Sequence, residues 1–500
     1  MDRRAVIGVD IGTSSSKGVL VSLAGDILRT AVREHSVDRP QAGHVEMPAE
    51  LWWQEFREIA AELNRDGDRE IVAVGVSGMG PCLVLTDHDD APLRPAILYG
   101  VDTRATEQIT QLNTRLGETE IMRRGGSRLS SQAVGPKILW VHDNEPELYA
   151  RARRLYMPSS WLVRKLTGSY VLDVHSASQC TPLFDTATGG WNWDWATDIV
   201  GDVELPPLAW PGDVAGAVSR DAAAQTGLPV GIPVITGTID AWSEAVSVGA
   251  TKPGDLMLMY GTTMFLVNTV ASPVSTPAMW STAGAFPGTS SLAGGMATSG
   301  AITAWLRELF GRPSYPELLC EAEASGRGAN GLLMLPYFAG ERTPVSDPDA
   351  RGIIAGLTVS HSRGDLYRAA LESTAFGVRH NIEAMKAAGA PIHRVFAVGG
   401  GTQGALWTQI VSDVTGLSQV IPSTSIGASF GAAFLAASTV QSVSIESWNP
   451  PAELRTPQRQ HSADYDALYA EYMALYPATV EISHTLARRQ RAAAVPAAQS

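Results

Sequence analysis

Residues 6–21 constrain the fold more than any other part of the chain. Two apolar runs rich in β-branched side chains flank a turn that holds one carboxylate (Asp10), two glycines, four hydroxyl side chains and Lys17. The pattern predicts a β-hairpin over residues 5–12 and 17–23. Glycine lets backbone N–H groups approach an anion, and hydroxyl and ammonium groups donate hydrogen bonds to it. We therefore expect the tip of this hairpin to bind phosphate.

Asp10 is the unusual residue of this turn, because a carboxylate repels a bare phosphate. A cation between the two groups removes the repulsion, and Mg²⁺ is typically held by one or two carboxylates, water and nucleotide phosphates. The turn therefore favours a magnesium–nucleotide site. The alternative is a plain hairpin whose small-residue turn contains an ordinary turn aspartate.

The length and charge of the chain limit its architecture and partners. A chain of 500 residues exceeds the size at which a single core stops growing, so two large domains are expected. The formal net charge is −13 and the sequence has no basic stripe, which disfavours a nucleic-acid partner. An acidic protein binds a polyphosphate through local features, namely backbone N–H groups, helix N-termini and a metal ion.

The three cysteines, Cys82, Cys180 and Cys320, show neither metal-binding spacing nor a paired framework. That pattern is typical of the reducing cytoplasm, where we expect the protein to act. The N-terminal residues run directly into a predicted strand, and no run of about 18 apolar residues occurs. Neither a signal peptide nor a membrane-spanning helix is therefore expected.

A second strand–turn–strand pattern, over residues 256–267, repeats the first, with Gly-Thr-Thr at 261–263 where the first has Gly-Thr-Ser. Residues 251–255 break the preceding helical pattern and mark a domain boundary. The repetition indicates two related α/β domains with a cleft between them, in which a nucleotide would meet one turn from each half. Further strands are predicted at residues 27–35, 71–76, 83–87, 229–236 and 395–402, and helices at 51–63, 240–250 and 403–415.

Asp240 follows the apolar run 229–236 and precedes a predicted helix. A carboxylate at such a position can act as a general base. It can equally cap the helix, since aspartate is favoured at helix N-termini. The local sequence does not distinguish between these two roles.

Several motifs resemble those of the FGGY carbohydrate kinases, and together they cover almost the whole chain. Residues 10–17 resemble the first phosphate motif of that family, and residues 136–144 resemble its first signature. Residues 352–357, followed by 365–372, resemble its second signature. The Gly-Glu-Arg-Thr-Pro run at 340–344 is closer to the xylulokinase branch than to the glycerol kinase branch. The order of these motifs along the chain carries the resemblance.

The resemblance implies an α/β fold of two actin-like, ribonuclease-H-like domains around a nucleotide cleft. It divides the chain into an N-terminal domain (residues 1–248), a C-terminal ATP-binding domain (residues 249–485) and a tail (residues 486–500) that we expect to be disordered or a frayed helix. It also implies ATP and Mg²⁺ as cofactors and a small sugar or polyol as substrate. Dimers are common in this family, so a homodimer is an open expectation.

The resemblance assigns roles to individual residues. Asp240 matches the catalytic aspartate, which accepts the proton of the sugar hydroxyl and contacts the metal, and Asp10 holds Mg²⁺ through water. The residues matched to phosphate contacts are Thr13, Ser14, Lys17, Gly261, Thr262 and Gly300, with lysine at 17 where glycerol kinases have arginine. Those matched to the adenosine pocket are Gly400, Gly401 and Thr402. For Gly300 the alternative is simple close packing, and Trp407 nearby is more often a core residue than a ligand contact.

The sugar side departs from the family pattern. Xylulokinases usually carry Gln-Met-His after the third strand, whereas this chain has Met79, Gly80 and Pro81 with no histidine. A tryptophan usually stands two residues before the Asp-x-Arg element, whereas Gly100 stands two residues before Asp102. We expect residues 79–81 and Asp102 to contact the substrate. Asp102 can instead pair with the arginine at 104 or cap a helix.

These features favour ATP-dependent phosphorylation of D-xylulose to D-xylulose 5-phosphate, with gluconate, ribulose and other polyols as alternatives. Two other classes are a non-catalytic ATP switch of the actin-like fold and a sugar sensor without chemistry. The presence of both Asp10 and Asp240, and the order of the family motifs, disfavour these classes.

Overall fold

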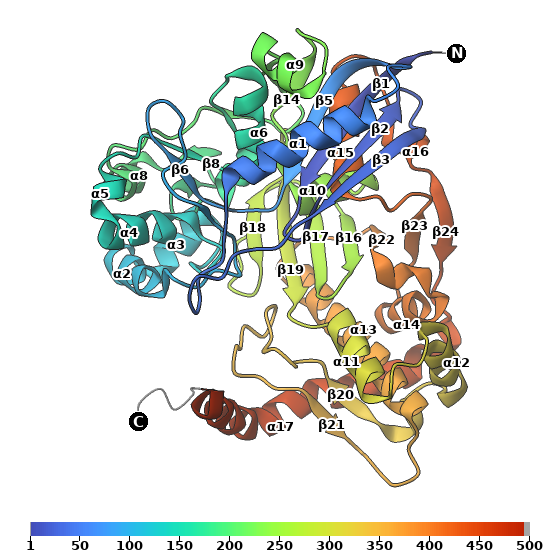
Figure 1. The fold of residues 1–500 in the computed structure, drawn as a ribbon. Helices are drawn as coiled ribbons and strands as arrows, with labels where there is room; N and C mark the ends of the chain where they lie inside the picture. Colours follow the sequence, from blue (N-terminus) through green and yellow to red (C-terminus); the bar gives the residue numbers. More distant parts are fainter. Residues whose placement is uncertain (1, 495–500) are drawn as a thin grey trace. The chain divides into compact units, whose positions relative to one another are not determined.

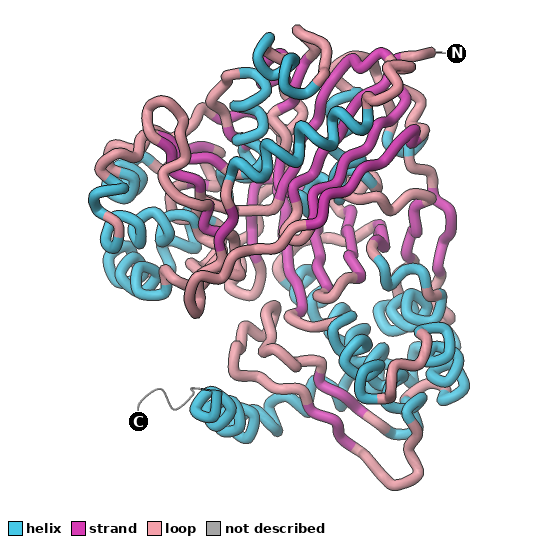
Figure 2. Tube along the Cα trace, in the orientation of Figure 1, coloured by secondary structure: helices cyan, strands magenta, loops and turns pink. Residues whose placement is uncertain are grey.

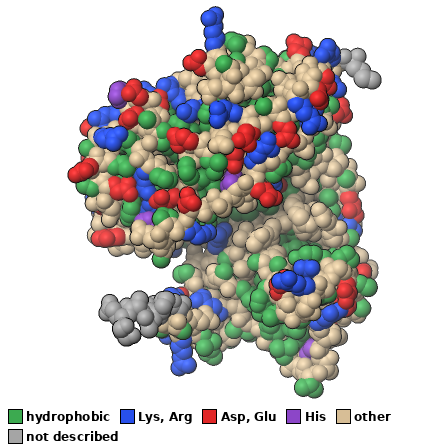
Figure 3. Space-filling view, viewed as in Figure 1, with side chains coloured by type: hydrophobic (Ala, Val, Ile, Leu, Met, Phe, Trp, Pro, Cys, Tyr) green, Lys and Arg blue, Asp and Glu red, His purple; other side chains and the backbone are tan. Residues whose placement is uncertain are grey.

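The computed structural model describes residues 2–494, which form two compact units (Figure 1). The first unit comprises the chain up to Pro253 together with Thr269–Leu292 and Thr424–Pro450. The second unit comprises Gly254–Asn268, Ala293–Ser423 and the chain from Pro451 onward. Figure 2 shows helices, strands and loops in both. Acidic and basic side chains are interspersed on the face shown in Figure 3.

A mixed sheet with the strand order β13-β14-β5-β1-β2-β3 organises the first unit, and β15 also pairs with β5. Its strands are β1 (Arg4–Ile11), β2 (Ser15–Ser22), β3 (Ile27–Glu34), β5 (Glu70–Gly78), β13 (Val214–Ala217), β14 (Pro233–Ile235) and β15 (Thr238–Ile239). The predicted hairpin is present as β1 and β2, which pair antiparallel with Asp10 opposite Lys17. Strand β5 lies parallel to β1 on its other side.

Alternate side chains of β1 face opposite layers, as the period of a strand requires. Ile7, Val9 and Ile11 belong to a core shared with the helices α1 (Ala49–Leu63) and α6 (Pro158–Thr167). On the other face, Gly8 lies against α15 (Ala428–Ala437), where an added Cβ would stand 2.0 Å from the carbonyl oxygen of Ser429. Helix α15 therefore packs directly on the backbone of the sheet, and glycine is required for that approach.

The apolar run that precedes Asp240 forms two short strands rather than one. Strand β14 ends at Ile235, and β15 begins at Thr238. Gly237 between them has φ +73°, and an added Cβ there would lie 2.2 Å from the carbonyl oxygen of Val76. The glycine turns the chain so that both strands pair with β5. Helix α10 (Asp240–Ser247) follows at once.

The first unit contains further helices and short strand pairs outside this sheet, and several of them share a second core that includes Leu112, Ile121 and Ile138. Its helices are α2 (Thr106–Leu116), α3 (Glu118–Gly125), α4 (Val134–Asn144), α5 (Pro146–Tyr149), α7 (Val174–Ser178), α8 (Trp193–Val200), α9 (Arg220–Thr226) and α16 (Ile445–Trp448). Short strand pairs are β4 (Glu46–Met47) with β7 (Ala96–Ile97), β6 (Val84–Thr86) with β8 (Arg154–Tyr156), β9 (Leu172–Asp173) with β12 (Leu208–Ala209), and β10 (Phe184–Asp185) with β11 (Gly190–Trp191). Strand β18 (Trp280–Ala283) pairs with β19 (Ser290–Met296).

The second unit repeats the central arrangement of the first. Strands β16 and β17 form an antiparallel hairpin, and β22 lies parallel to β16, as β5 does to β1. The strand order is β19-β17-β16-β22-β23-β24. The strands are β16 (Asp255–Tyr260), β17 (Met264–Val270), β19 (Ser290–Met296), β20 (Leu333–Leu335), β21 (Ile353–Ala355), β22 (Arg394–Val398), β23 (Gln419–Pro422) and β24 (Pro451–Arg455). The helices are α11 (Gly300–Leu309), α12 (Tyr315–Ser325), α13 (Arg363–Ala387), α14 (Ala405–Thr415) and α17 (Ser462–Ala494), with short 3₁₀ turns η1 (Ala329–Gly331), η2 (Gly400–Gln403) and η3 (Arg459–His461).

Of the two alternatives expected for the C-terminal tail, a helix is present over the part that the structure describes. Helix α17 continues to Ala494, so residues 486–494 are helical, and residues 495–500 lie outside the described range. An ion pair between Arg491 and Asp349, together with the buried side chain of Ala487, holds this last part against the second unit. Among the described residues, no helix is both long and apolar enough to cross a membrane.

Candidate functional site

The register of three parallel strands brings the candidate acidic residues to one edge of the first sheet. Asp10 on β1 pairs in register with Ser77 on β5, and Ser77 pairs with Thr238 on β15. Asp240 stands two residues after Thr238 and is the first residue of α10. In open α/β sheets, ligands bind beyond the carboxyl ends of the parallel strands. Asp10 and Asp240 both lie at this edge.

The two aspartates interact electrostatically. Burial and the neighbouring charge of Asp240 raise the pKa of Asp10, while a hydrogen bond from Ser77 Oγ to Asp10 Oδ1 (2.9 Å) acts in the opposite direction. Burial also raises the pKa of Asp240. Its Oδ1 accepts a hydrogen bond from the backbone N–H of Ala241 at 2.7 Å, so the side chain also satisfies one N–H of the first helical turn. Two like charges at one edge favour a cation there.

Glu244 is a third acidic group at this edge, and the sequence analysis missed it. It lies four residues after Asp240 on α10, a spacing that places both side chains on one face of a helix. Burial and the charge of Asp240 raise the pKa of Glu244 to about 7, while Lys17 lowers it. The spacing of the two carboxylates was visible in the sequence and was the signal that could have identified Glu244.

These residues fit a hydrated magnesium ion. Carboxylate oxygens are the ligands that Mg²⁺ prefers, and the ion usually keeps several of its waters. The ligand oxygens of Asp10, Asp240 and Glu244 do not form a group within 4.8 Å of one another in the described structure, so they would hold an ion partly through water. Binding of Mg²⁺ by Asp10 through water stays a prediction.

The turn between β1 and β2 exposes the groups expected to contact phosphate. Ser14 and Lys17 are exposed, and Thr13 is partly exposed. The hydroxyl of Thr13 forms a 2.7 Å hydrogen bond with the phenolic oxygen of Tyr99. This contact links the phosphate turn to the segment that leads into Asp102, a connection that local sequence patterns do not reveal.

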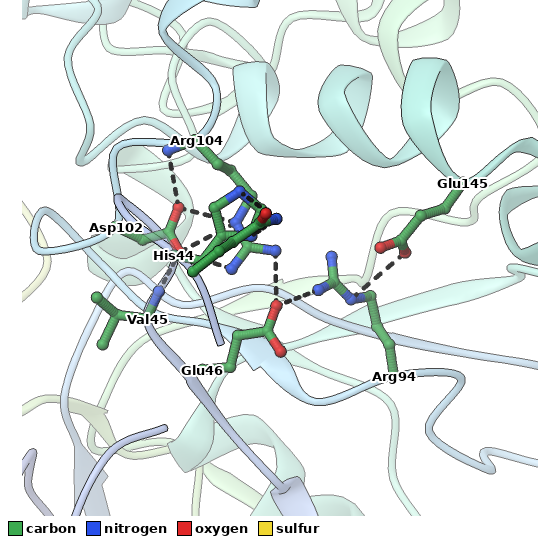
Figure 4. Close-up of polar contacts among 8 residues, drawn as sticks. His44, Val45, Glu46, Arg94, Asp102, Arg104 and Glu145 are labelled. Atoms are coloured by element: carbon green, nitrogen blue, oxygen red, sulfur yellow. Dashed lines mark hydrogen bonds and ion pairs between the residues drawn. The ribbon is translucent and has the colours of Figure 1, made fainter. Parts of the chain in front are cut away.

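Asp102 is held by protein groups in this structure (Figure 4). Its side chain is 1 % exposed and forms a bidentate ion pair with Arg104, with a shortest distance of 2.7 Å. Its Oδ2 also accepts the backbone N–H of Val45 at 2.6 Å. Arg104 in turn contacts Glu46 at 2.7 Å, and Arg94 pairs with the same glutamate. The alternative role of Asp102, an ion pair with Arg104, is therefore what these contacts support, and a contact with sugar stays a prediction.

The expected substrate loop lies next to Asp240. The backbone N–H of Met79 donates to the carbonyl of Ile11 at 2.7 Å, which ties the loop to the end of β1. An added Cβ on Gly80 would stand 2.7 Å from the side chain of Ile239, the residue before Asp240. Met79 and Pro81 are buried, whereas Gly80 is partly exposed. Contact of residues 79–81 with a substrate stays a prediction.

In the second unit, the turn between β16 and β17 packs against the start of α11. The backbone N–H groups of Gly300 and Ala301 donate to the carbonyls of Gly261 and Thr262, both at 3.0 Å. An added Cβ on Gly300 would stand 2.6 Å from the carbonyl oxygen of Gly261. Close packing therefore explains glycine at position 300, and phosphate contacts by Gly261, Thr262 and Gly300 stay predictions.

The glycine-rich segment at 400–402 forms the 3₁₀ turn after β22. An added Cβ on Gly401 would lie 2.8 Å from both Tyr260 and Trp407, whereas one on Gly400 would meet nothing within 4 Å. The hydroxyl of Thr402 donates to the carbonyl of Gly399 at 2.8 Å. Trp407 is buried, as the core interpretation predicts. Adenosine contacts by residues 400–402 stay a prediction.

The chain is similar to known proteins over most of its length. Residues 5–247 match the N-terminal domain model of the FGGY family of carbohydrate kinases, and residues 256–440 match the C-terminal domain model. The crystal structure of xylulose kinase from Rhodospirillum rubrum is 31 % identical, with a TM-score of 0.91 over 96 % of this chain and 100 % of that one. Xylulose kinase of Escherichia coli K12 is 29 % identical over 82 % of this chain and 84 % of its own length. Glycerol kinase of Nocardia farcinica is 30 % identical over 87 % and 90 %.

The family models together span most of the chain, and the R. rubrum enzyme shares its architecture over almost the full length. These matches confirm the expected resemblance, the two-domain α/β fold and the expectation of a sugar-phosphorylating enzyme. The chain therefore belongs to the FGGY family of carbohydrate kinases.

Proposed function

We propose that this kinase transfers the γ-phosphoryl group of ATP to D-xylulose, giving D-xylulose 5-phosphate, and that Asp240 is the general base. The observation that carries the proposal is that Asp10 and Asp240 lie at the carboxyl ends of β1 and β15, where the charge of Asp240 raises the pKa of Asp10. Supporting it are the xylulose kinase relatives from R. rubrum and E. coli, the first of them aligned over 96 % of this chain.

Bound Mg²⁺ and ATP would supply the phosphoryl group and neutralise its negative charge. Phosphoryl transfer then needs little from the protein beyond positioning and a base for the acceptor hydroxyl. The carboxylate of Asp240 accepts the hydroxyl proton, and the raised pKa makes it a stronger base than an exposed aspartate. Asp10, Asp240 and Glu244 would hold the hydrated cation, and Thr13, Ser14 and Lys17 would donate to the transferred phosphate.

The proposed ATP contacts in the second unit are Gly261, Thr262, Gly300, Gly400, Gly401 and Thr402, and the proposed substrate contacts in the first are Met79, Gly80, Pro81 and Asp102. A homodimer and a cytoplasmic location, both expected from the sequence, complete the proposal. A polyol such as glycerol is the second candidate substrate, because a glycerol kinase is 30 % identical over 87 % of this chain.

A coupled ADP-release assay with Mg²⁺ and ATP tests the proposal. The acceptor panel is D-xylulose, L-xylulose, D-ribulose, L-ribulose, gluconate, glycerol and erythritol, and ³¹P NMR of the product identifies the phosphorylated position. We expect D-xylulose to have the highest kcat/KM. A preference for another acceptor would retain the kinase mechanism and reject the proposed substrate.

The base assignment needs a separate variant. Asp240→Asn should lower kcat by at least about 100-fold and leave ATP binding within a few-fold, because a general base contributes about 10²–10⁴ to the rate. Asp221→Asn is the matched control, since Asp221 is an exposed aspartate in the first turn of another helix, α9. Near-normal turnover by Asp240→Asn would reject Asp240 as the base.

A further inference from the structure

A buried histidine supports the phosphate turn from behind. His35 directly follows β3, and its side chain is 4 % exposed. Its Nδ1 faces the carboxylate of Glu55 on α1, at 3.1 and 3.0 Å from the two oxygens. Its Nε2 faces the carbonyl oxygen of Gly12 at 3.0 Å. Glu55 also accepts a 2.5 Å hydrogen bond from Ser16 Oγ on β2. These hydrogen bonds therefore connect α1 to the phosphate turn.

The partners of His35 define its protonation state. A carbonyl oxygen only accepts hydrogen bonds, so Nε2 must carry a proton. A carboxylate likewise accepts, so Nδ1 also carries one, and the ring is an imidazolium. Burial alone would lower the pKa of His35, but the hydrogen bond and charge of Glu55 outweigh burial and raise it. A neutral ring would leave Nδ1 and the carboxylate as two acceptors facing each other.

The contact with Gly12 controls the orientation of one peptide group. The peptide unit is planar and trans, so the C=O of Gly12 and the N–H of Thr13 point in opposite directions. Because the carbonyl is held inward by His35, the N–H of Thr13 points away from the buried network. The backbone N–H of His35 also donates to the carbonyl of Ser14 at 3.1 Å, which secures the other end of the turn.

We propose that His35 is a positioning residue for the phosphate turn. As an imidazolium bound to Glu55, it holds the Gly12 carbonyl inward and so presents the Thr13 N–H to the γ-phosphate of ATP. The inference rests on the proposed function for the identity of the phosphate. The arrangement of charge and backbone that it describes exists in the protein without nucleotide.

The protonation state is tested first, on the full chain labelled with ¹⁵N-histidine and without nucleotide. We expect both ring nitrogens of His35 to be protonated at pH 7.5, with the signal assigned through its loss in His35→Gln. His175 is the internal reference, since it is also buried but burial lowers its pKa to about 3. Its Nδ1 donates to the carbonyl of Ala283 and its Nε2 faces the amide nitrogen of Gln179, so it should be neutral. A neutral His35 ring would overturn the proposal.

Nucleotide affinity tests the positioning role. His35→Ala should weaken binding of the magnesium complex of AMP-PNP by about tenfold, the effect of about one lost hydrogen bond, and change ADP affinity by less than threefold. Arg33→Gln is the matched control, because Arg33 also links β3 to α1, through Glu58 (2.9 Å) and Glu62 (2.8 Å), but its side chain is partly exposed. The control should change neither affinity. Equal losses for both nucleotides would indicate a merely structural residue and overturn the proposal.

The variant Glu55→Gln distinguishes a change in the charge of the His35 ring from general disruption of the fold. The new amide can donate to Nδ1 of a neutral His35, whose Nε2–H still donates to Gly12. We expect the ¹⁵N spectrum to change to a neutral ring while AMP-PNP affinity stays within about threefold of the wild type. Retention of the charged ring in this variant would overturn the role of Glu55. The ¹⁵N spectrum and the AMP-PNP affinity of Glu55→Gln remain informative even if His35→Ala does not fold. Neither measurement depends on sugar turnover. Failure of the proposed function would be recognised separately, by the acceptor panel and Asp240→Asn.

Discussion

Lys137 on α4 gives a prediction with a clear sign and size. Its side chain is 1 % exposed, and among the described residues Nζ has no hydrogen-bond partner. A buried ammonium without a partner destabilises the folded state. Burial lowers the pKa of Lys137 from 10.5 to about 8, and the thiol of Cys82 only partly offsets that effect. We expect Lys137→Met, which has a similar volume and no charge, to stabilise the protein at neutral pH.

The expected gain in stability follows from the difference between the folded and unfolded pKa values of Lys137. A lysine whose pKa is lower in the folded state contributes stability above its unfolded pKa, and that stability is lost as the pH falls through the folded value. Lowering the pKa from 10.5 to about 8 corresponds to about 3 kcal/mol. At pH 7 the wild type is destabilised by nearly the whole of this amount. At pH 9.5 about 1 kcal/mol of it should remain. The gain from Lys137→Met should therefore shrink as the pH rises.

Urea unfolding without nucleotide, followed by tryptophan fluorescence at pH 7, 8, 9 and 9.5, measures this difference. Lys386→Met is the control, because Lys386 is exposed in the last turn of α13 and its loss should change stability by no more than about 0.5 kcal/mol. The reasoning would be refuted by a Lys137→Met protein that is less stable than the wild type at pH 7, or by a difference that does not vary with pH.

Three further outcomes follow from the described contacts. Gly300→Ala should weaken ATP binding about tenfold or more, because its Cβ would stand 2.6 Å from the Gly261 carbonyl. Gly190→Ala is the control, because an added Cβ there meets nothing within 4 Å and Gly190 lies outside the proposed site; calorimetric titration with ATP compares the two variants, and equal affinities would contradict the packing argument. Asp102→Asn should lower the free energy of unfolding by about 3 kcal/mol, because it removes the bidentate partner of the buried Arg104 and leaves that cation only its contact with Glu46; urea unfolding measures the loss, and unchanged stability would contradict the expectation. Glu244→Gln should weaken Mn²⁺ binding at least threefold without altering the circular dichroism spectrum, and unchanged affinity by electron paramagnetic resonance would exclude Glu244 from the metal site.

The sequence predicted the parts of the fold that depend on local patterns. Two apolar runs on either side of a small-residue turn identified β1 and β2, and the same pattern identified β16 and β17. Helical spacing identified α1 and α14 to within a few residues. These elements follow from hydrophobic periodicity and turn chemistry, which act over a few neighbouring residues. The run before Asp240 was less predictable, because Gly237 divides it through a contact with the distant Val76.

The candidate site shows the same division. Asp10 and Asp240 could be selected from the sequence as acidic residues at strand ends, and the family motifs gave them roles. The two aspartates share one edge because β5 pairs with both β1 and β15, and this pairing is set by the tertiary structure. The sequence left undecided whether Asp102 pairs with Arg104. The structure contains this ion pair, and both side chains are buried.

The sequence by itself determined several of the strands and helices, and which residues can bind a phosphate or a cation, because those properties depend on residue type and short spacing. Only the tertiary structure decided that His35 contacts Gly12 across 23 positions, and that Glu55 and Ser16 complete the same buried network. Such contacts arise from packing between elements that are distant in the chain, and the need to pair buried charges makes them specific.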